Sequence, residues 1–294
     1  MYSQIAANKR KTWVLVTLFS VLIMLIFVGI GATGNIDPIA SVTIGFGFSL
    51  IYSLIAYYVS GKAVLLTHVA KEIDKANAPD LYRMVENLCI SSGLPMPKVY
   101  IINDPSANAF ASGRDPEHAS ITFTTGILQI LTKQELEGVI AHELSHIKNY
   151  DIRVMTVVVV LVGLIILLAD IMLRMSFGGN DRKTTWPLIV AALLLALLSP
   201  IIAQLIKLAV SRSREYLADA SGALITRHPD ALASALGKLK QSKPLKSANH
   251  ATAHLFISNP FGSEAEKKQS WYKNLFSTHP PIDARIAKLR EMGR

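Results

Sequence analysis

Long apolar stretches alternate with polar ones along the chain, and this alternation predicts its broad architecture. A helix needs about 20 apolar residues to span the hydrocarbon core of a bilayer. The stretches that reach this length lie at about 13–32, 39–59, 155–173 and 186–205. We therefore expect four transmembrane helices in two hairpins. A second interpretation of the later pair is a hairpin that is buried in protein or lies in the membrane interface.

The polar segments carry shorter patterns that are typical of a small α+β domain. Helices are predicted where apolar positions recur at helical spacing, at 80–92, 211–225, 229–239 and 281–292. Thr132 and Glu135 form a capping box that opens one further helix. Strands are predicted at 98–103, 108–111 and 119–124. The stretch 243–269 has few apolar positions, so we expect a mobile loop or lid there.

Composition agrees with this membrane interpretation. Of the 294 residues, 51% are hydrophobic and 17% are charged, and the mean hydropathy of +0.35 is too apolar for a soluble domain of this size. The net charge of +9 comes from scattered Lys and Arg residues, which argues against nucleic acid as a partner. The single cysteine, Cys89, excludes an internal disulfide and is expected to be a buried thiol.

The distribution of basic residues predicts the orientation in the membrane. Basic residues at 9–11 precede the first span, whereas the connection 33–38 contains no Lys or Arg. Cytoplasmic loops carry the excess of Lys and Arg, so the N-terminus is expected in the cytoplasm. Four spans return the C-terminus to the same side. The expected organisation is a hairpin at 1–59, a cytoplasmic segment at 60–154, a second hairpin at 155–205 and a cytoplasmic segment at 206–294 of a multi-pass cell-membrane protein.

The sequence His142-Glu143-Leu144-Ser145-His146 matches the H-E-x-x-H pattern of zinc peptidases. Four residues apart on a helix, the two imidazoles face one way and can share a metal ion. Glu143 then lies beside the metal and can act as the general base for the attacking water. The alternative is a chance match on an ordinary amphipathic helix. It is disfavoured because buried His and Glu cost stability unless they are bound.

A catalytic zinc site needs a third protein ligand, with water in the fourth position. Glu215 is the candidate, and Asp219, one helical turn later, can accept a hydrogen bond from the N–H of a ligating histidine. His250 and His254 are a rival pair with the same spacing. They lack an intervening acid and fall in the predicted loop, so we interpret them as incidental.

Several motifs together resemble the HtpX family of membrane zinc metalloproteases, which are relatives of the CAAX prenyl endopeptidases. The motifs are HELSHIKNYD, two apolar spans, SREYLADASGA and STHPPIDARI, preceded by LPMPKVYI and NAFASGR. The resemblance implies a cytoplasmic zincin-like domain with one Zn²⁺ per chain, held by His142, His146 and Glu215, and Glu143 as the catalytic glutamate. It implies proteolytic quality control of misfolded membrane proteins at the cytoplasmic face, often under stress. Tyr150 departs from the small residue found there in many relatives, which leaves the role of that turn open.

The same resemblance assigns further residues. The strand of Asn108, Ala109, Phe110 and Ala111 is expected to pair with the substrate backbone, a form of strand addition that recognises conformation more than sequence. His279 is expected to help stabilise the tetrahedral oxyanion, and Arg285 to anchor the last helix. For both residues, ordinary capping or surface packing is the alternative.

Two other functional classes compete with a cytoplasm-facing endopeptidase. An intramembrane protease would carry H-E-x-x-H on an apolar helix, whereas Lys133, Glu135, Lys148 and Asp151 flank it here. A non-catalytic scaffold with a structural zinc would have no use for Glu143 and would close the fourth metal position with a ligand.

Overall fold

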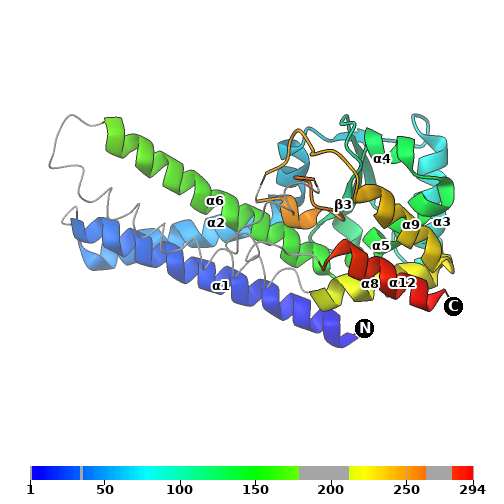
Figure 1. The fold of residues 1–294 in the computed structure, drawn as a ribbon. Helices are drawn as coiled ribbons and strands as arrows, with labels where there is room; N and C mark the ends of the chain where they lie inside the picture. The colour runs from blue at the N-terminus through cyan, green and yellow to red at the C-terminus, as the bar shows by residue number, and fades with distance from the viewer. Residues whose placement is uncertain (1, 34–35, 179–211, 250, 263–279, 294) are drawn as a thin grey trace.

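The computed structural model describes residues 2–33, 36–178, 212–249, 251–262 and 280–293. The helices α1 (Tyr2–Thr33), α2 (Pro38–Thr67) and α6 (Asp151–Gly178) extend to one side of the other elements (Figure 1). Both α1 and α2 are long and apolar enough to cross a membrane, as expected for the first two spans. Asp37 caps α2 by accepting a hydrogen bond from the N–H of Ala40, and Pro38 starts the helix.

The described half of the second predicted hairpin is also helical. Helix α6 includes the expected third span, 155–173, and its first half is buried against α1 and α2. Val157 and Leu161 of α6 join Phe19, Ile23 and Ala56 in one apolar cluster. The expected fourth span, 186–205, lies outside the described residues.

A four-stranded sheet in the described chain has the order β1-β2-β4-β3. Its strands are β1 (Lys71–Ile73), β2 (Lys98–Ile102), β3 (Ala109–Gly113) and β4 (Ala119–Thr124). Strands β2 and β4 are parallel, and the outer pairs are antiparallel. The three predicted strands are confirmed. Strand β1 was not predicted, because three residues are too few to show an alternating pattern. Strand β3 lies at an edge, next to the candidate site.

Helices pack around this sheet and build the main core. They are α3 (Pro79–Ser92), α4 (Thr125–Ile130), α5 (Lys133–Lys148), α8 (Arg212–Thr226), α9 (Pro229–Leu239) and α12 (Ile282–Met292), with short 3₁₀ helices at Pro116–His118 and Ala253–Leu255. The predicted helices and the capping box of Thr132 and Glu135 are confirmed. Cys89 is buried in the core, as predicted.

Helix α5 is the central helix of this arrangement, because α3, α8, α9 and β3 all contact it. Two glycines let its neighbours approach closely. A Cβ on Gly138 would lie 3.2 Å from the backbone of Leu232 in α9, and one on Gly222 in α8 would lie 3.0 Å from the backbone nitrogen of His142. Both contacts are tight against backbone atoms, so the helices could not lie so close with larger residues.

The predicted loop after α9 is irregular but packed. The apolar side chains of Leu245, Leu255, Phe256 and Ile257 are all at most 3% exposed. Phe256 lies edge-on to Phe110 of β3, with 4.9 Å between ring centroids. In the described part of the loop, few apolar positions therefore suffice to dock it on the sheet.

Candidate metal centre

Two histidines of α5 converge in the interior. His142 and His146 are 1% and 5% exposed, and their Nε2 atoms lie 3.2 Å apart. Their rings meet edge to face, because residues four apart on a helix project from nearly the same side. Two nitrogens thus face a common point, as the H-E-x-x-H spacing predicted.

Helix α8 brings a carboxylate to the same point. Glu215 is 1% exposed, with Oε1 3.4 Å from His146 Nε2 and Oε2 4.0 Å from His142 Nε2. Ligands about 2.0 to 2.1 Å from a tetrahedral zinc lie about 3.3 Å from one another. The nitrogen–nitrogen distance and the shorter nitrogen–oxygen distance are close to that value. His142, His146 and Glu215 form the group of potential metal ligands found among the described residues.

Asp219 and Arg285 pack directly behind these groups. Asp219 Oδ1 lies 2.9 Å from His142 Nδ1, within ion-pair distance but without the alignment of a regular hydrogen bond. Arg285, which is 0% exposed, donates to both oxygens of Asp219, from Nε at 2.8 Å and from Nη2 at 2.7 Å. Its Nη1 donates to Ile257 O at 3.1 Å and lies 3.5 Å from Glu215 Oε2. Arg285 is thus buried beside the candidate ligands, which excludes the alternative that it only packs on the surface.

Charge interactions shift the proton equilibria of these groups. Burial alone raises the pKa of Asp219, but the charge of Arg285 and hydrogen bonds outweigh it and hold this pKa at about 2. Burial raises the pKa of Glu143 to about 7, with a further contribution from the charge of Glu215. Burial lowers the pKa of His146, yet the hydrogen bond to Asp151 and the charge of Glu215 raise it to about 9. Asp219 therefore stays ionised, whereas His146 and Glu143 retain their protons to higher pH than usual.

The buried charges of the described residues fit a divalent cation. Each of the following side chains is at most 7% exposed: Glu143, Asp151, Glu215 and Asp219, with Arg214 and Arg285. Four carboxylates and two guanidiniums leave two negative charges without compensation when all are ionised. A buried, uncompensated charge is costly. One divalent cation would make the cluster neutral. Without a cation, the excess negative charge favours protonation, in agreement with the raised pKa values of His146 and Glu143.

Glu143 follows His142 on α5 and is 2% exposed. Helix α5 packs against β3, and burial raises the pKa of Glu143 by more than the backbone of Ala111 lowers it. The candidate base therefore lies close to the sheet edge, so a peptide lying along β3 would pass the carboxylate.

The edge of β3 that does not pair with β4 is contacted by the segment of Ile257 and Ser258. Ile257 N donates to Ala109 O at 3.0 Å, and Asn108 Nδ2 donates to Ser258 O at 2.8 Å. Phe110 and Ala111 are at most 3% exposed. The expected substrate strand therefore lies beside the centre, and its pairing groups at Asn108 and Ala109 already have partners.

Of the other three histidines named as candidates from the sequence, only His254 lies among the described residues. His254 is 1% exposed and its Nε2 lies 3.0 Å from the carbonyl oxygen of Met155, outside the ligand group. His250 and His279 lie outside the described residues.

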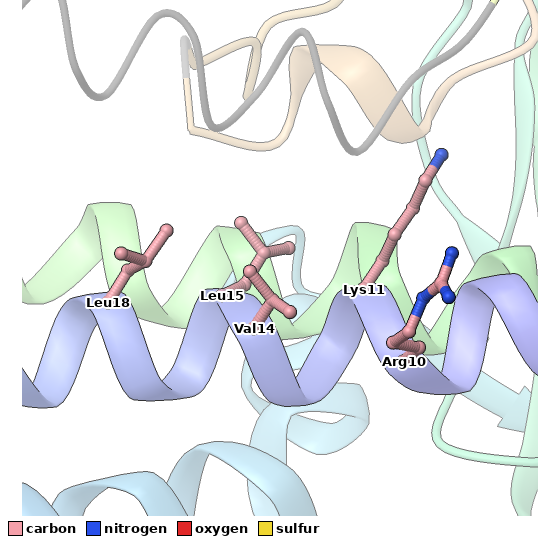
Figure 2. Close-up of a pocket in the computed structure, with 5 residues that line it drawn as sticks. All are labelled: Arg10, Lys11, Val14, Leu15 and Leu18. Carbon is pink, nitrogen blue, oxygen red and sulfur yellow. The ribbon is translucent and has the colours of Figure 1, made fainter.

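A hollow on α1 is lined by basic and apolar side chains and contains none of the expected site residues (Figure 2).

Sequence reasoning missed three buried polar residues beside the centre. Asp151 Oδ2 lies 3.0 Å from His146 Nδ1, and Arg214 Nη1 donates to Asp151 Oδ1 at 3.0 Å. Asn8 of α1 donates to the same Oδ1 at 2.8 Å. Asp151 and Arg214 lie within the quoted motifs HELSHIKNYD and SREYLADASGA, which was an available signal. Asn8 offered none, because it lies far away in the sequence.

The fold and the paired histidines with an intervening glutamate define a class, the metal-dependent peptidases. The sequence model of peptidase family M48 matches residues 75–293, and the chain belongs to this family. The protein is thus a metalloprotease.

Individual proteins of known family are also similar to this chain. The protease HtpX homolog of Tropheryma whipplei is 46% identical over 100% of this chain and 99% of its own length. The homolog of Lactobacillus acidophilus is 43% identical, covering 99% of this chain and 100% of that protein. The resemblance to the HtpX family is confirmed. The crystal structure of S. mikatae Ste24p has a TM-score of 0.53 at 19% identity, covering 98% of this chain and 67% of that one, which supports the fold.

Proposed function

We propose that this metalloprotease is a zinc-dependent endopeptidase that cleaves misfolded or unassembled membrane proteins at the cytoplasmic face of the cell membrane. His142, His146 and Glu215 would hold one Zn²⁺, and Glu143 would be the general base. The supporting observation is the convergence of two imidazole nitrogens and a carboxylate at one buried point. Glu143 lies on the same helix as the two histidines.

A bound zinc ion supplies a water of lowered pKa and polarises the scissile carbonyl. Glu143 accepts the proton of the attacking water and returns it to the leaving nitrogen. Packing of α5 against β3 keeps Glu143 close to the sheet edge. Asp219 orients the ring of His142, and Arg285 keeps Asp219 ionised. His279 is proposed to stabilise the oxyanion.

The substrate would be an extended polypeptide that adds to the edge of β3. Backbone pairing requires an unfolded segment and little sequence preference, which suits a protease of misfolded chains. The substrate must first replace Ile257 at the carbonyl of Ala109 and Ser258 at the side chain of Asn108. We expect the substrate backbone to lie where these hydrogen bonds are exchanged.

We also propose four spans, at about 13–32, 39–59, 155–173 and 186–205, with both termini and the protease segments in the cytoplasm. The asymmetry of Lys and Arg between the N-terminus and the 33–38 connection supports this. Labelling Asn35→Cys with an impermeant thiol reagent in intact cells tests it. The buried Cys89 is the background control. Labelling that appears only after permeabilisation would contradict the orientation.

Metal content and peptide hydrolysis, measured together, test the mechanism. Glu143→Gln should retain about one zinc per chain and lose casein cleavage, because Glu143 is a base and not a ligand. His142→Ala should lose both. Undiminished cleavage by Glu143→Gln would refute the mechanism. Zinc retention by His142→Ala would refute the ligand assignment. An inactive native protein with tightly held zinc would favour a structural site.

A further inference from the structure

The N-terminal helix reaches the neighbourhood of the metal centre through one side chain. Asn8 of α1 is 2% exposed, and its Nδ2 donates to Asn149 O at 2.9 Å and to Asp151 Oδ1 at 2.8 Å. Asn149 and Asp151 belong to the turn that joins α5 to α6. The N-terminal end of α1 is drawn beside α8 in Figure 1, in agreement with the hydrogen bond that Arg214 of α8 donates to Asn8. A residue of the first apolar helix thus contacts the turn that follows the H-E-x-x-H motif.

These contacts form a network that reaches one candidate ligand and the residue next to another. Arg214 Nη1 donates to Asp151 Oδ1 at 3.0 Å and to Asn8 Oδ1 at 3.2 Å. The other oxygen of Asp151 lies 3.0 Å from His146 Nδ1. Arg214 is also the residue before Glu215 on α8. Asn8, Asp151 and Arg214 therefore connect His146 on α5 with the residue next to Glu215.

The first helix also supports the backbone of the turn. Tyr150 has a φ of 60°, a left-handed conformation that is unfavourable for a residue with a bulky side chain. The ammonium of Lys9 lies 4.7 Å from the centre of its ring, and the guanidinium of Arg153 lies 4.9 Å from it. Such cation–π contacts are attractive and hold the ring in place. Asn8 and Lys9 thus fix the turn from which Asp151 projects.

We infer that Asn8, Asp151 and Arg214 are positioning residues for the metal centre, and that metal affinity depends on docking of the first apolar helix. The inference rests on the proposed role of His146 as a ligand. A metal-ligating histidine needs its other ring nitrogen held by an acceptor, and loss of such a partner weakens metal binding. Asn8 is suited to hold Asp151, because a neutral amide can donate to the carboxylate and accept from Arg214 without adding charge.

A role in helix packing alone would not require this side chain. The docked face of α1 continues through Leu15, Phe19 and Ile23, which are at most 3% exposed. Thr12 is buried on the same face, and its hydroxyl donates to the backbone oxygen of Asn8 at 3.0 Å. Thr12→Val therefore removes a buried polar group of α1 but leaves the side-chain contacts of Asn8, Asp151 and Arg214 in place, and it is the matched control.

The test uses the full-length protein in detergent, stripped of metal and titrated with Zn²⁺ against a chromophoric chelator. The absorption spectrum with Co²⁺ reports ligand geometry independently of activity. Asp151→Asn should weaken zinc binding by about 10- to 100-fold, and Asn8→Ala by about tenfold, both with an altered Co²⁺ spectrum. Thr12→Val should stay near the native affinity and spectrum. If Asn8→Ala aggregates, Asn8→Ser is measured in its place and should lose affinity in the same direction.

Native affinity and an unchanged spectrum in the Asn8 variant, with zinc lost in His146→Ala, would overturn the inference and leave the proposed function intact. An equal loss in Thr12→Val would overturn it as well, because general loosening of α1 would then explain the effect. Zinc retention by His146→Ala would instead overturn the ligand assignment, and with it this inference.

Discussion

Arg285→Met tests how far the buried charges of the centre depend on one another. The substitution keeps a long side chain but removes the guanidinium, which donates to both oxygens of Asp219 and to Ile257 O. It also removes the positive charge 3.5 Å from Glu215 Oε2. Asp219 and Glu215 would remain in the interior, where they are at most 3% exposed.

The expected cost follows from this burial. Removing one partner of a buried ion pair costs about 3–5 kcal/mol, because the other charge stays desolvated and unpaired. For a domain of this size, each kcal/mol lowers the Tm by about 2–4 °C, so the metal-free protein should melt about 6–20 °C below the native protein. Bound zinc supplies positive charge next to Glu215, so the fall should be smaller in the loaded form. Arg285→Lys keeps the positive charge but loses the forked guanidinium, so its metal-free Tm should lie between those of the native protein and Arg285→Met.

Thermal unfolding in detergent, with zinc and after chelation, measures these differences. Arg290→Met is the matched control, because Arg290 lies on the same helix and is exposed. A metal-free Tm of Arg285→Met that matches the native value would refute the reasoning. So would an equal fall in Arg290→Met, since loss of a surface charge would then account for the change.

Three further substitutions test separate parts of the structure. Ile257→Pro removes the N–H that occupies the edge of β3, so cleavage of an unfolded substrate should become faster, as seen in kcat/KM. Gly222→Ala forces α8 away from the backbone of His142 and should weaken zinc binding. Glu135→Gln removes an ion pair with Lys238 and should lower the free energy of unfolding by about 1–2 kcal/mol at neutral pH. Burial raises the pKa of Glu135, but hydrogen bonds from Lys238 and others bring it to about 2, so this stabilisation is present above pH 4.5 and disappears as the pH falls toward 2.

Each of these has a matched control in the chain. Ile257→Ala keeps the backbone donor and should leave the rate near native. Gly237→Ala places its Cβ in open space within α9 and should not affect zinc binding. Glu137→Gln changes a less buried carboxylate on α5 and should leave the free energy of unfolding at neutral pH near the native value. Slower cleavage by Ile257→Pro would contradict the placement of the substrate, and native zinc affinity in Gly222→Ala would contradict a rigid contact between α5 and α8.

Local patterns predicted the elements and the chemistry of this protein well. The capping box at Thr132 predicted where α5 begins, because the pattern and its hydrogen bonds lie within one helical turn. The spacing of His142 and His146 predicted their convergence for the same reason. The helices and the longer strands followed from periodicity. Information of this kind is local, so it is visible without knowledge of the fold.

Contacts between distant segments could not be predicted in this way. Asn8 is a single polar residue on an apolar helix, and nothing near it in the sequence indicates a partner such as Arg214, 206 positions away. Arg285 was expected to anchor the last helix, but no local pattern indicated that its partner would be Asp219, 66 positions away. Occupation of the β3 edge by Ile257 likewise depends on how the loop packs. These features arise from tertiary packing, and no periodic pattern records them.

The long-range contacts explain how a buried, highly charged centre can be stable. Its candidate ligands come from α5 and α8, and their partners come from the first apolar helix, the start of α6 and the last helix. None of these segments alone can compensate the four carboxylates. Two arginines and a divalent cation can, but only when all the segments are docked. A metal bound at the proposed site would therefore require a geometry that the folded chain alone provides, and its binding energy would stabilise that fold in return. For a protease, this coupling would confine the active centre to the fully assembled protein.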